Sequence, residues 1–251
     1  GRTLLRRSIS LALEQRLLIQ EARKTEPGLF RTPLLAPVII TGMPRSGTTF
    51  LHRLLAADET MRAPTLAELV EPVACKRGWR RSLRDLRLDI ELWVMRFLNR
   101  DLDARHFTRS DEPEECMFAL AISFRTMLPW TLAPVRSYLA WYAGADRHQK
   151  YRDYRDILML LQRRAPERRL LLKAPDHLGS LAELVAAVPE ALIVVCRRDP
   201  AVSLTSFNSL LDGLHQVTVR DADRVELGRS NLAFYAAETE RYVSARRTCP
   251  G

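Results

Sequence analysis

The sequence predicts an α/β fold, a doubly wound parallel sheet with helices on both faces. Three short apolar runs carry this prediction, at 38–41 (VIIT), 170–173 (LLLK) and 191–196 (ALIVVC). Each run is followed by a turn and then by apolar residues at helical spacing. Strands that are apolar throughout and that alternate with helices indicate a parallel sheet buried on both faces. The length of 251 residues suits one such domain.

The remaining segments are predicted to be helical. Residues 4–24 carry leucine and isoleucine at helical spacing, and four Pro and Gly residues between 27 and 37 then form a connector. We therefore treat 1–251 as a single domain, with an N-terminal helix and connector at 1–37 and a largely helical insertion at 64–165. The tail at 222–247 is again expected to be helical. In the insertion, Trp130, Tyr138, Trp141 and Tyr142 either line an apolar pocket or pack as a core.

Composition and charge restrict the class of protein. Hydrophobic residues make up 47% of the chain, which excludes bulk disorder, and no apolar run reaches the ~18 residues that a membrane helix needs. The formal net charge of +9 favours polyanionic ligands, but the arginines are scattered and no nucleic-acid-binding motif is present. The cysteines are far apart, which argues against disulfides and structural zinc and favours the reducing cytoplasm. The start at Gly1 suggests a fragment or a processed product.

The segment 42–49, GMPRSGTT, is predicted to bind a phosphate or sulfate group. A glycine-containing turn between a buried strand and a helix directs backbone N–H groups at one point, and the helix N-terminus adds partial positive charge. Its spacing matches the nucleotide-triphosphatase loop, except that Thr48 replaces the required lysine. The cation is Arg45 instead. The simpler alternative is a strand–helix turn with capping threonines.

The missing lysine argues against phosphoryl transfer. Without it, and without an acidic strand end to hold Mg²⁺, a transferring γ-phosphoryl group loses its usual charge-neutralising partners. The SO₃ unit carries less charge, so sulfuryl transfer without a metal fits the segment better. A small-molecule kinase that uses ATP stays as the alternative.

Four segments resemble one family. PRSGTT at 44–49 resembles the 5′-phosphosulfate loop of sulfotransferases that use 3′-phosphoadenosine 5′-phosphosulfate (PAPS). Arg198, at the end of a predicted strand, and Ser206, eight residues later on a helix, resemble the family's 3′-phosphate site. LKAPDH at 172–177 is similar to the Leu-Lys-Ser-Pro-x-His segment of the broad bacterial sulfotransferase family. His106 with PEEC at 113–116 resembles that branch's His…Pro-Glu-Glu-Cys region. The matches cover residues 38–212.

The resemblance implies a cytoplasmic bacterial enzyme. It implies a P-loop-like fold, PAPS as sulfuryl donor, PAP (the adenosine 3′,5′-bisphosphate product) and no metal. The acceptor is then a hydroxyl of a small molecule, covered by the helical insertion. Neither nucleic acid nor stable membrane insertion is expected, and a homodimer is compatible with it. Members of this branch normally continue beyond residue 251, so we expect truncation at the C-terminus, and a catalytically incomplete nucleotide-binding module is a further alternative. The donor-binding residues implied are Arg45, Ser46, Gly47, Thr48, Thr49, Arg198 and Ser206.

The expected catalytic residues are Lys173, which would assist Arg45 at the leaving phosphate, and a general base. Lys173 could instead be a strand-end lysine whose amine extends to water. His106 is the first candidate for the base because imidazole titrates near neutral pH and acidic residues just downstream could orient it. His177 at a strand end is the second and Glu68 is the third. Each has a simpler interpretation: a surface histidine, a helix cap and a solvated helical face. We expect His52, His148 and His215 to lie on helix surfaces.

Overall fold

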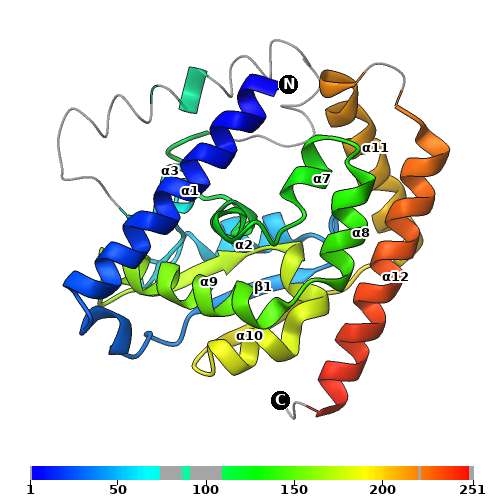
Figure 1. The fold of residues 1–251 in the computed structure, drawn as a ribbon. Coiled ribbons are helices and arrows are strands. Elements are labelled where there is room, and N and C mark those ends of the chain that lie inside the picture. The colour runs from blue at the N-terminus through cyan, green and yellow to red at the C-terminus, as the bar shows by residue number, and fades with distance from the viewer. Residues whose placement is uncertain (1, 74–85, 87, 91–108, 220–221, 249–251) are drawn as a thin grey trace.

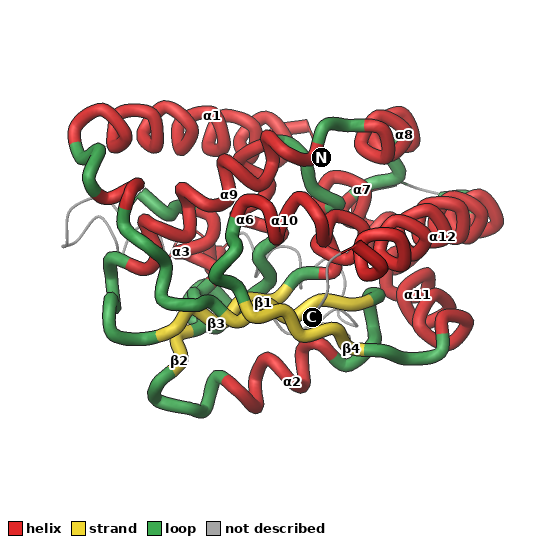
Figure 2. The backbone as a smooth tube through the Cα atoms, turned by 90° about the horizontal axis from the view of Figure 1, so that it is seen from below, coloured by secondary structure: helices red, strands yellow, loops and turns green. Residues whose placement is uncertain are grey.

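The computed structural model describes residues 2–73, 86, 88–90, 109–219 and 222–248. Its centre is a parallel sheet in the order β2-β3-β1-β4 (Figures 1 and 2). The strands are β1 (Val38–Gly42), β2 (Met61–Arg62), β3 (Arg169–Lys173) and β4 (Leu192–Cys196). The three apolar runs of the sequence therefore form strands, and the predicted α/β class with a parallel sheet is confirmed.

The register of the sheet brings three strand ends to one edge. β1 pairs in parallel with β3 on one side and with β4 on the other, with Ile40 opposite both Lys173 and Val194. Since parallel strands end on the same side, the segments that follow β1, β3 and β4 meet at the carboxyl edge. Ligands of open α/β sheets bind at this edge.

The two faces of the sheet are covered unequally. The short helix α2 (Thr48–Leu55) lies on one face, and α9 (Arg147–Gln162) and α10 (Leu181–Ala187) lie on the other (Figure 2). Helix α2 contacts β1 and β3. Leu192 and Val194 of β4 stay 51% and 37% exposed. The predicted burial on both faces is therefore correct for β1 and β3 but wrong for the α2 side of β4.

The second layer of helices begins with α1 (Arg2–Thr25), the predicted N-terminal helix, which is followed by the 3₁₀ turn η1 (Leu29–Arg31). The described part of 64–165 holds α3 (Leu66–Val70), α6 (Met117–Leu120), the 3₁₀ turn η2 (Ala121–Ser123), α7 (Leu128–Leu132), α8 (Arg136–Gly144) and α9. The 3₁₀ turn η3 (Pro175–Ser180) follows β3, and the chain continues through α11 (Pro200–Thr218) and α12 (Arg224–Thr248). No helix in the described ranges is long and apolar enough to cross a membrane.

The aromatic residues of the insertion mainly build a second core. Trp130 and Tyr142 are buried among apolar residues of α11 and α12, whereas Trp141 is half exposed. Trp130 Nε1 donates a hydrogen bond to Asn231 Oδ1 at 2.8 Å, which satisfies the buried indole. Packing, rather than an apolar pocket, therefore accounts for these two rings.

Two histidines that we expected on helix surfaces are buried. His52 Nε2 lies 3.4 Å from the carbonyl oxygen of Leu171, and His215 Nε2 lies 2.7 Å from that of Trp130. Burial lowers the pKa of His52 to about 4 and also lowers that of His215. The surface prediction was wrong for both, because a carbonyl partner lets a neutral imidazole enter the core.

A buried ion pair joins α9 to α12 and also contacts the segment after β3. Arg147, at the start of α9, forms a bidentate pair with Glu238 of α12, with Nη2 to Oε1 at 2.6 Å and Nη1 to Oε2 at 2.8 Å. The same guanidinium donates to the carbonyl of Gly179 and to Ser180 Oγ, each at 2.9 Å. A Cβ at Gly179 would overlap the Glu238 side chain. This close approach fixes α12 against the turn that follows Lys173.

Candidate active site at the carboxyl edge of the sheet

The loop after β1 adopts a backbone that needs glycine. Gly42, Arg45 and Gly47 have φ angles of 150°, 66° and 94°. A Cβ at Gly42 would overlap the carbonyl oxygen of Cys196 on β4. Gly47 is the left-handed residue that precedes α2. The loop therefore turns sharply and brings the chain into the N-terminus of α2, as an anion site requires.

The hydroxyl groups of this loop differ in their surroundings. Ser46 Oγ is buried and has no hydrogen-bond partner within the described part of the chain. Thr48 is buried at the start of α2, and Thr49 beside it is exposed. A buried hydroxyl without a partner costs stability. Ser46 is therefore suited to donate to an anion held by the loop.

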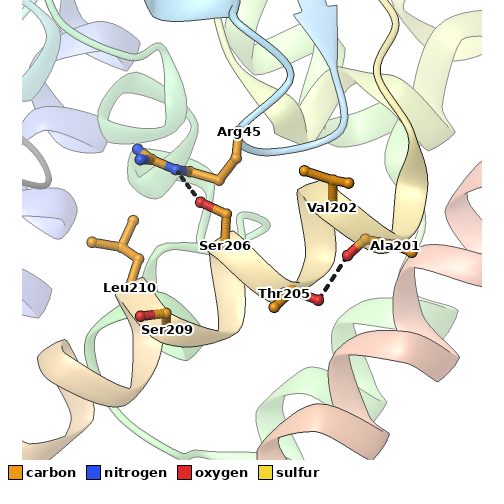
Figure 3. Close-up of a pocket in the computed structure, with 7 residues that line it drawn as sticks. All are labelled: Arg45, Ala201, Val202, Thr205, Ser206, Ser209 and Leu210. Atoms are coloured by element: carbon orange, nitrogen blue, oxygen red, sulfur yellow. Dashed lines mark hydrogen bonds between the residues drawn. The ribbon is translucent and has the colours of Figure 1, made fainter.

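The predicted loop cation and the predicted strand-end pair lie together. Arg45 Nε donates a hydrogen bond to Ser206 Oγ of α11 at 3.1 Å (Figure 3). Arg198 Nη1 donates to the carbonyl oxygen of Arg45 at 3.0 Å. One bond runs from the loop to α11, and the other runs to the loop from the turn that precedes α11. Arg45 of the loop thus forms one cationic corner with Arg198 and Ser206, which lie far from it in the sequence.

A groove opens beside this corner. It has a volume of about 640 Å³ and is lined by Arg45 and by one side of α11, from Ala201 to Leu210 (Figure 3). Helix α11 begins here because Pro200 takes its first position and Asp199 caps it by accepting from the N–H groups of Ala201 and Val202. Ser206 lies on the groove wall, within hydrogen-bonding reach of Arg45.

Lys173 lies at the end of β3 and reaches the same loop from the other side. Its Nζ donates to Thr49 Oγ1 at 3.2 Å and to Glu115 Oε1 at 2.7 Å. The lysine side chain is 2% exposed. The carboxyl edge therefore carries cations on both sides of the loop, with Arg45 and Arg198 on one side and Lys173 on the other.

Comparison with known proteins agrees with this geometry. The model of the Sulfotransferase family matches residues 37–251, which is most of the chain and includes all of these groups. The chain belongs to the sulfotransferase family. A search of curated proteins gave no match.

Solved sulfotransferases share the fold. STF1 of Mycobacterium tuberculosis superposes with a TM-score of 0.79 at 29% sequence identity, over 95% of this chain and 66% of that one. STF9 of Mycobacterium avium superposes with a TM-score of 0.78 at 26% identity, over 94% of this chain and 62% of that one. This sulfotransferase chain thus spans about two thirds of the length of these proteins.

His177, one of the predicted bases of the sulfotransferase site, lies in the core. His177 has no exposed surface, and its Nδ1 lies 2.9 Å from the hydroxyl of Tyr151. Burial and the nearby Lys150 hold the pKa of His177 well below its ordinary value. Its imidazole is therefore neutral and enclosed, which suits a core residue better than a proton acceptor at an open edge.

Glu68 also has structural partners. Its carboxylate accepts from Arg62 Nη2 at 2.6 Å and from Arg164 Nη1 at 2.8 Å, and it completes a capping box with Thr65 at the start of α3. Burial raises the pKa of this carboxyl, but the two guanidinium groups outweigh burial and leave it below its ordinary value. Glu68 is therefore a weak base whose oxygens already accept hydrogen bonds from Arg62, Arg164 and the Thr65 N–H.

The first candidate for the base, His106, lies outside the described residues. The contact that sequence reasoning missed is the ion pair between Glu115 and Lys173, because Glu115 was expected only to help orient His106. A signal did exist in the two motifs that contain them. PEEC and LKAPDH both resemble segments of one family, so their acidic and basic residues could have been expected to meet.

Proposed function

We propose that this chain binds PAPS and transfers its sulfuryl group to a hydroxyl of a small-molecule acceptor, in line and without a metal. The observation that carries the proposal is the meeting of Arg45, Arg198 and Ser206 at one corner of the groove. A donor with phosphate groups at the 5′ and 3′ positions of one ribose needs two neighbouring anion sites, separated by the sugar ring. The phosphate loop and the start of α11 would supply them.

Each donor group has residues suited to it. The N–H groups of the loop, the hydroxyls of Ser46, Thr48 and Thr49, and the N-terminus of α2 would hold the 5′-phosphosulfate. Arg198 and Ser206 would hold the 3′-phosphate by charge-assisted hydrogen bonds. In that case Arg198 and Ser206 exchange their present contacts with Arg45 for contacts with the ligand.

The proposed transfer is an in-line displacement at sulfur. The acceptor oxygen forms a bond to sulfur while the bond from sulfur to the bridging phosphate oxygen breaks, and that oxygen takes the electron pair. Arg45 and Lys173 would stabilise the negative charge as it develops, which lowers the barrier because the charge is larger in the transition state. His106 would accept the acceptor's proton.

The cysteines support a cytoplasmic site of action, which is part of the proposal. Cys116 and Cys196, the cysteines in the described ranges, are free thiols, and burial raises the pKa of Cys116 to about 11. Thiols kept in the protonated form are compatible with a reducing compartment.

The first test is nucleotide selectivity. PAPS and PAP are expected to bind at least about tenfold more tightly than ATP, without Mg²⁺, because charge-assisted hydrogen bonds to the 3′-phosphate are available only to them. Isothermal titration of the three ligands with and without Mg²⁺ measures this. ATP binding that equals or exceeds PAP binding and requires Mg²⁺ would favour the kinase alternative. PAPS binding without turnover would favour the incomplete module.

The second test concerns the 3′-phosphate. Arg198→Ala is expected to weaken PAP binding by about 1.5–3 kcal/mol through lost charge-assisted hydrogen bonds. Adenosine 5′-phosphosulfate, which has no 3′-phosphate, should bind almost as before. Arg197→Ala is the matched control, since it removes the same charge from the adjacent position. Equal losses for both ligands in Arg198→Ala would mean that Arg198 only braces the loop through the Arg45 carbonyl.

A further inference from the structure

The ion pair between Glu115 and Lys173 is built into the fold rather than formed by two mobile side chains. The N–H of Cys116, the residue after Glu115, donates to the carbonyl oxygen of Lys173 at 2.8 Å. The backbone next to Glu115 is therefore bonded directly to the backbone of Lys173. Just upstream, Glu114 N donates to the carbonyl oxygen of Pro64, and Thr65 and Pro113 form an antiparallel bridge. Glu115 is therefore presented to Lys173 from a fixed segment.

The pair also has little access to water. The side chains of Lys173 and Glu115 are 2% and 14% exposed. An ammonium group in such a place is costly unless a carboxylate compensates it, and without one it tends to lose its proton. Glu115 therefore supplies the counter-charge to the Lys173 ammonium and holds it beside Thr49 on the first turn of α2.

We propose that Glu115 is a positioning residue for sulfuryl transfer, which acts by keeping the Lys173 ammonium charged and directed at the phosphate loop. This inference rests on the function proposed above. A charge fixed in place before the reaction needs no reorganisation when the leaving phosphate oxygen becomes negative. The contact through which Glu115 would act is its ion pair with Lys173, whose Nζ also donates to Thr49 Oγ1.

Other titratable groups interact with the pair through space. His52 and Cys116 act on Lys173, and their pKa values are about 4 and about 11. Asp176 and Tyr235 act on Glu115 through space, and burial raises the pKa of both. An alkaline change that disappears when arginine replaces Lys173 therefore reports the lysine, because guanidinium stays charged.

The first measurement does not depend on activity. The chain has four lysines, Lys24, Lys76, Lys150 and Lys173, so a chain labelled with ¹³C-lysine gives few side-chain signals. Lys173→Arg identifies the Lys173 signal by its loss. Glu115→Gln is expected to move the alkaline titration of that signal to lower pH, and Glu115→Asp to restore much of it. The signal of buried Lys150 shows whether the variant is folded, because Lys150 packs against Tyr142 instead. An unmoved Lys173 titration in folded Glu115→Gln would overturn the proposal.

The second measurement is kinetic. Glu115→Gln is expected to lower kcat by up to about 100-fold with the KM for PAPS nearly unchanged, and to shift the alkaline limb of the kcat profile to lower pH. In the Lys173→Arg background the same change should produce no such shift, because guanidinium stays charged throughout this range. A shift that persists with arginine at 173 would overturn the proposal. A wild-type chain that transfers no sulfuryl group would refute the proposed function instead, whatever the lysine signal does.

Discussion

His106→Ala is expected to lower turnover by about 10²–10⁴-fold while PAPS affinity stays near that of the wild type. The reason is chemical, since a general base contacts the acceptor's proton and not the nucleotide. Its loss should therefore appear in the transfer step alone. Single-turnover rates at saturating PAPS, together with equilibrium binding of PAP, separate the two quantities.

The structure supplies the matched controls for this prediction. His177→Ala removes an enclosed ring that contacts Tyr151 and Tyr154, and Glu68→Gln weakens a carboxylate shared by two arginines. We expect both variants to lose stability in urea rather than to lose the transfer step selectively. A selective loss of turnover in either one would assign the base there. Full activity of His106→Ala would refute the role of His106.

Glu238→Ala is expected to destabilise the chain by about 3–5 kcal/mol, because it leaves the Arg147 guanidinium buried without its counter-charge. Urea unfolding followed by circular dichroism measures the loss, provided that the denaturant slope is unchanged. Glu240→Ala on the same helix is the control, since that side chain is exposed and should change stability little. A loss in Glu238→Ala no larger than that of the control would contradict the assignment.

Replacing both members of the pair separates charge from packing. Arg147→Met combined with Glu238→Leu removes both charges and keeps apolar volume, so it should recover a large part of the stability that Glu238→Ala loses. If the double variant is as unstable as the sum of the single variants, the hydrogen bonds of Arg147 to Gly179 and Ser180 carry the stabilisation instead.

Local patterns of the sequence predict the strands and the loop well. Val38 to Thr41 is apolar and is followed by a glycine-containing turn and a helix, and both the strand and the positive φ angles follow from that order. The coverage of β4 could not be predicted in the same way. Its residues are as apolar as those of β1, but exposure depends on whether α2 extends far enough to cover them, which is a property of the packing.

In the site, too, the spacing of residues in the sequence could be used for prediction, but the contacts between distant side chains could not. The interval between Arg198 and Ser206 indicates a pair at the start of one helix, but nothing local indicates that Arg45, 161 positions before Ser206, donates to its hydroxyl. The burial of His52 and His215 depends on carbonyl groups of distant segments, which single-residue patterns do not report. The ion pair of Lys173 with Glu115 likewise joins residues that are distant in the sequence, so no local pattern predicts it.

The two hydrogen bonds that join the loop to α11 and to the turn before it have a thermodynamic consequence. Helix α11 also packs on α7, where Trp130 contacts His215 and Thr218 Oγ1 donates to the carbonyl of Leu132 at 3.1 Å. The anion site and the helical insertion therefore share one rigid element. A ligand on the insertion that displaced α11 would change the affinity of the loop for its anion, and by reciprocity the anion would change that ligand's affinity by the same factor. If the donor binds at the loop and the acceptor on the insertion, as proposed, their binding would be coupled through α11 without contact between the two ligands.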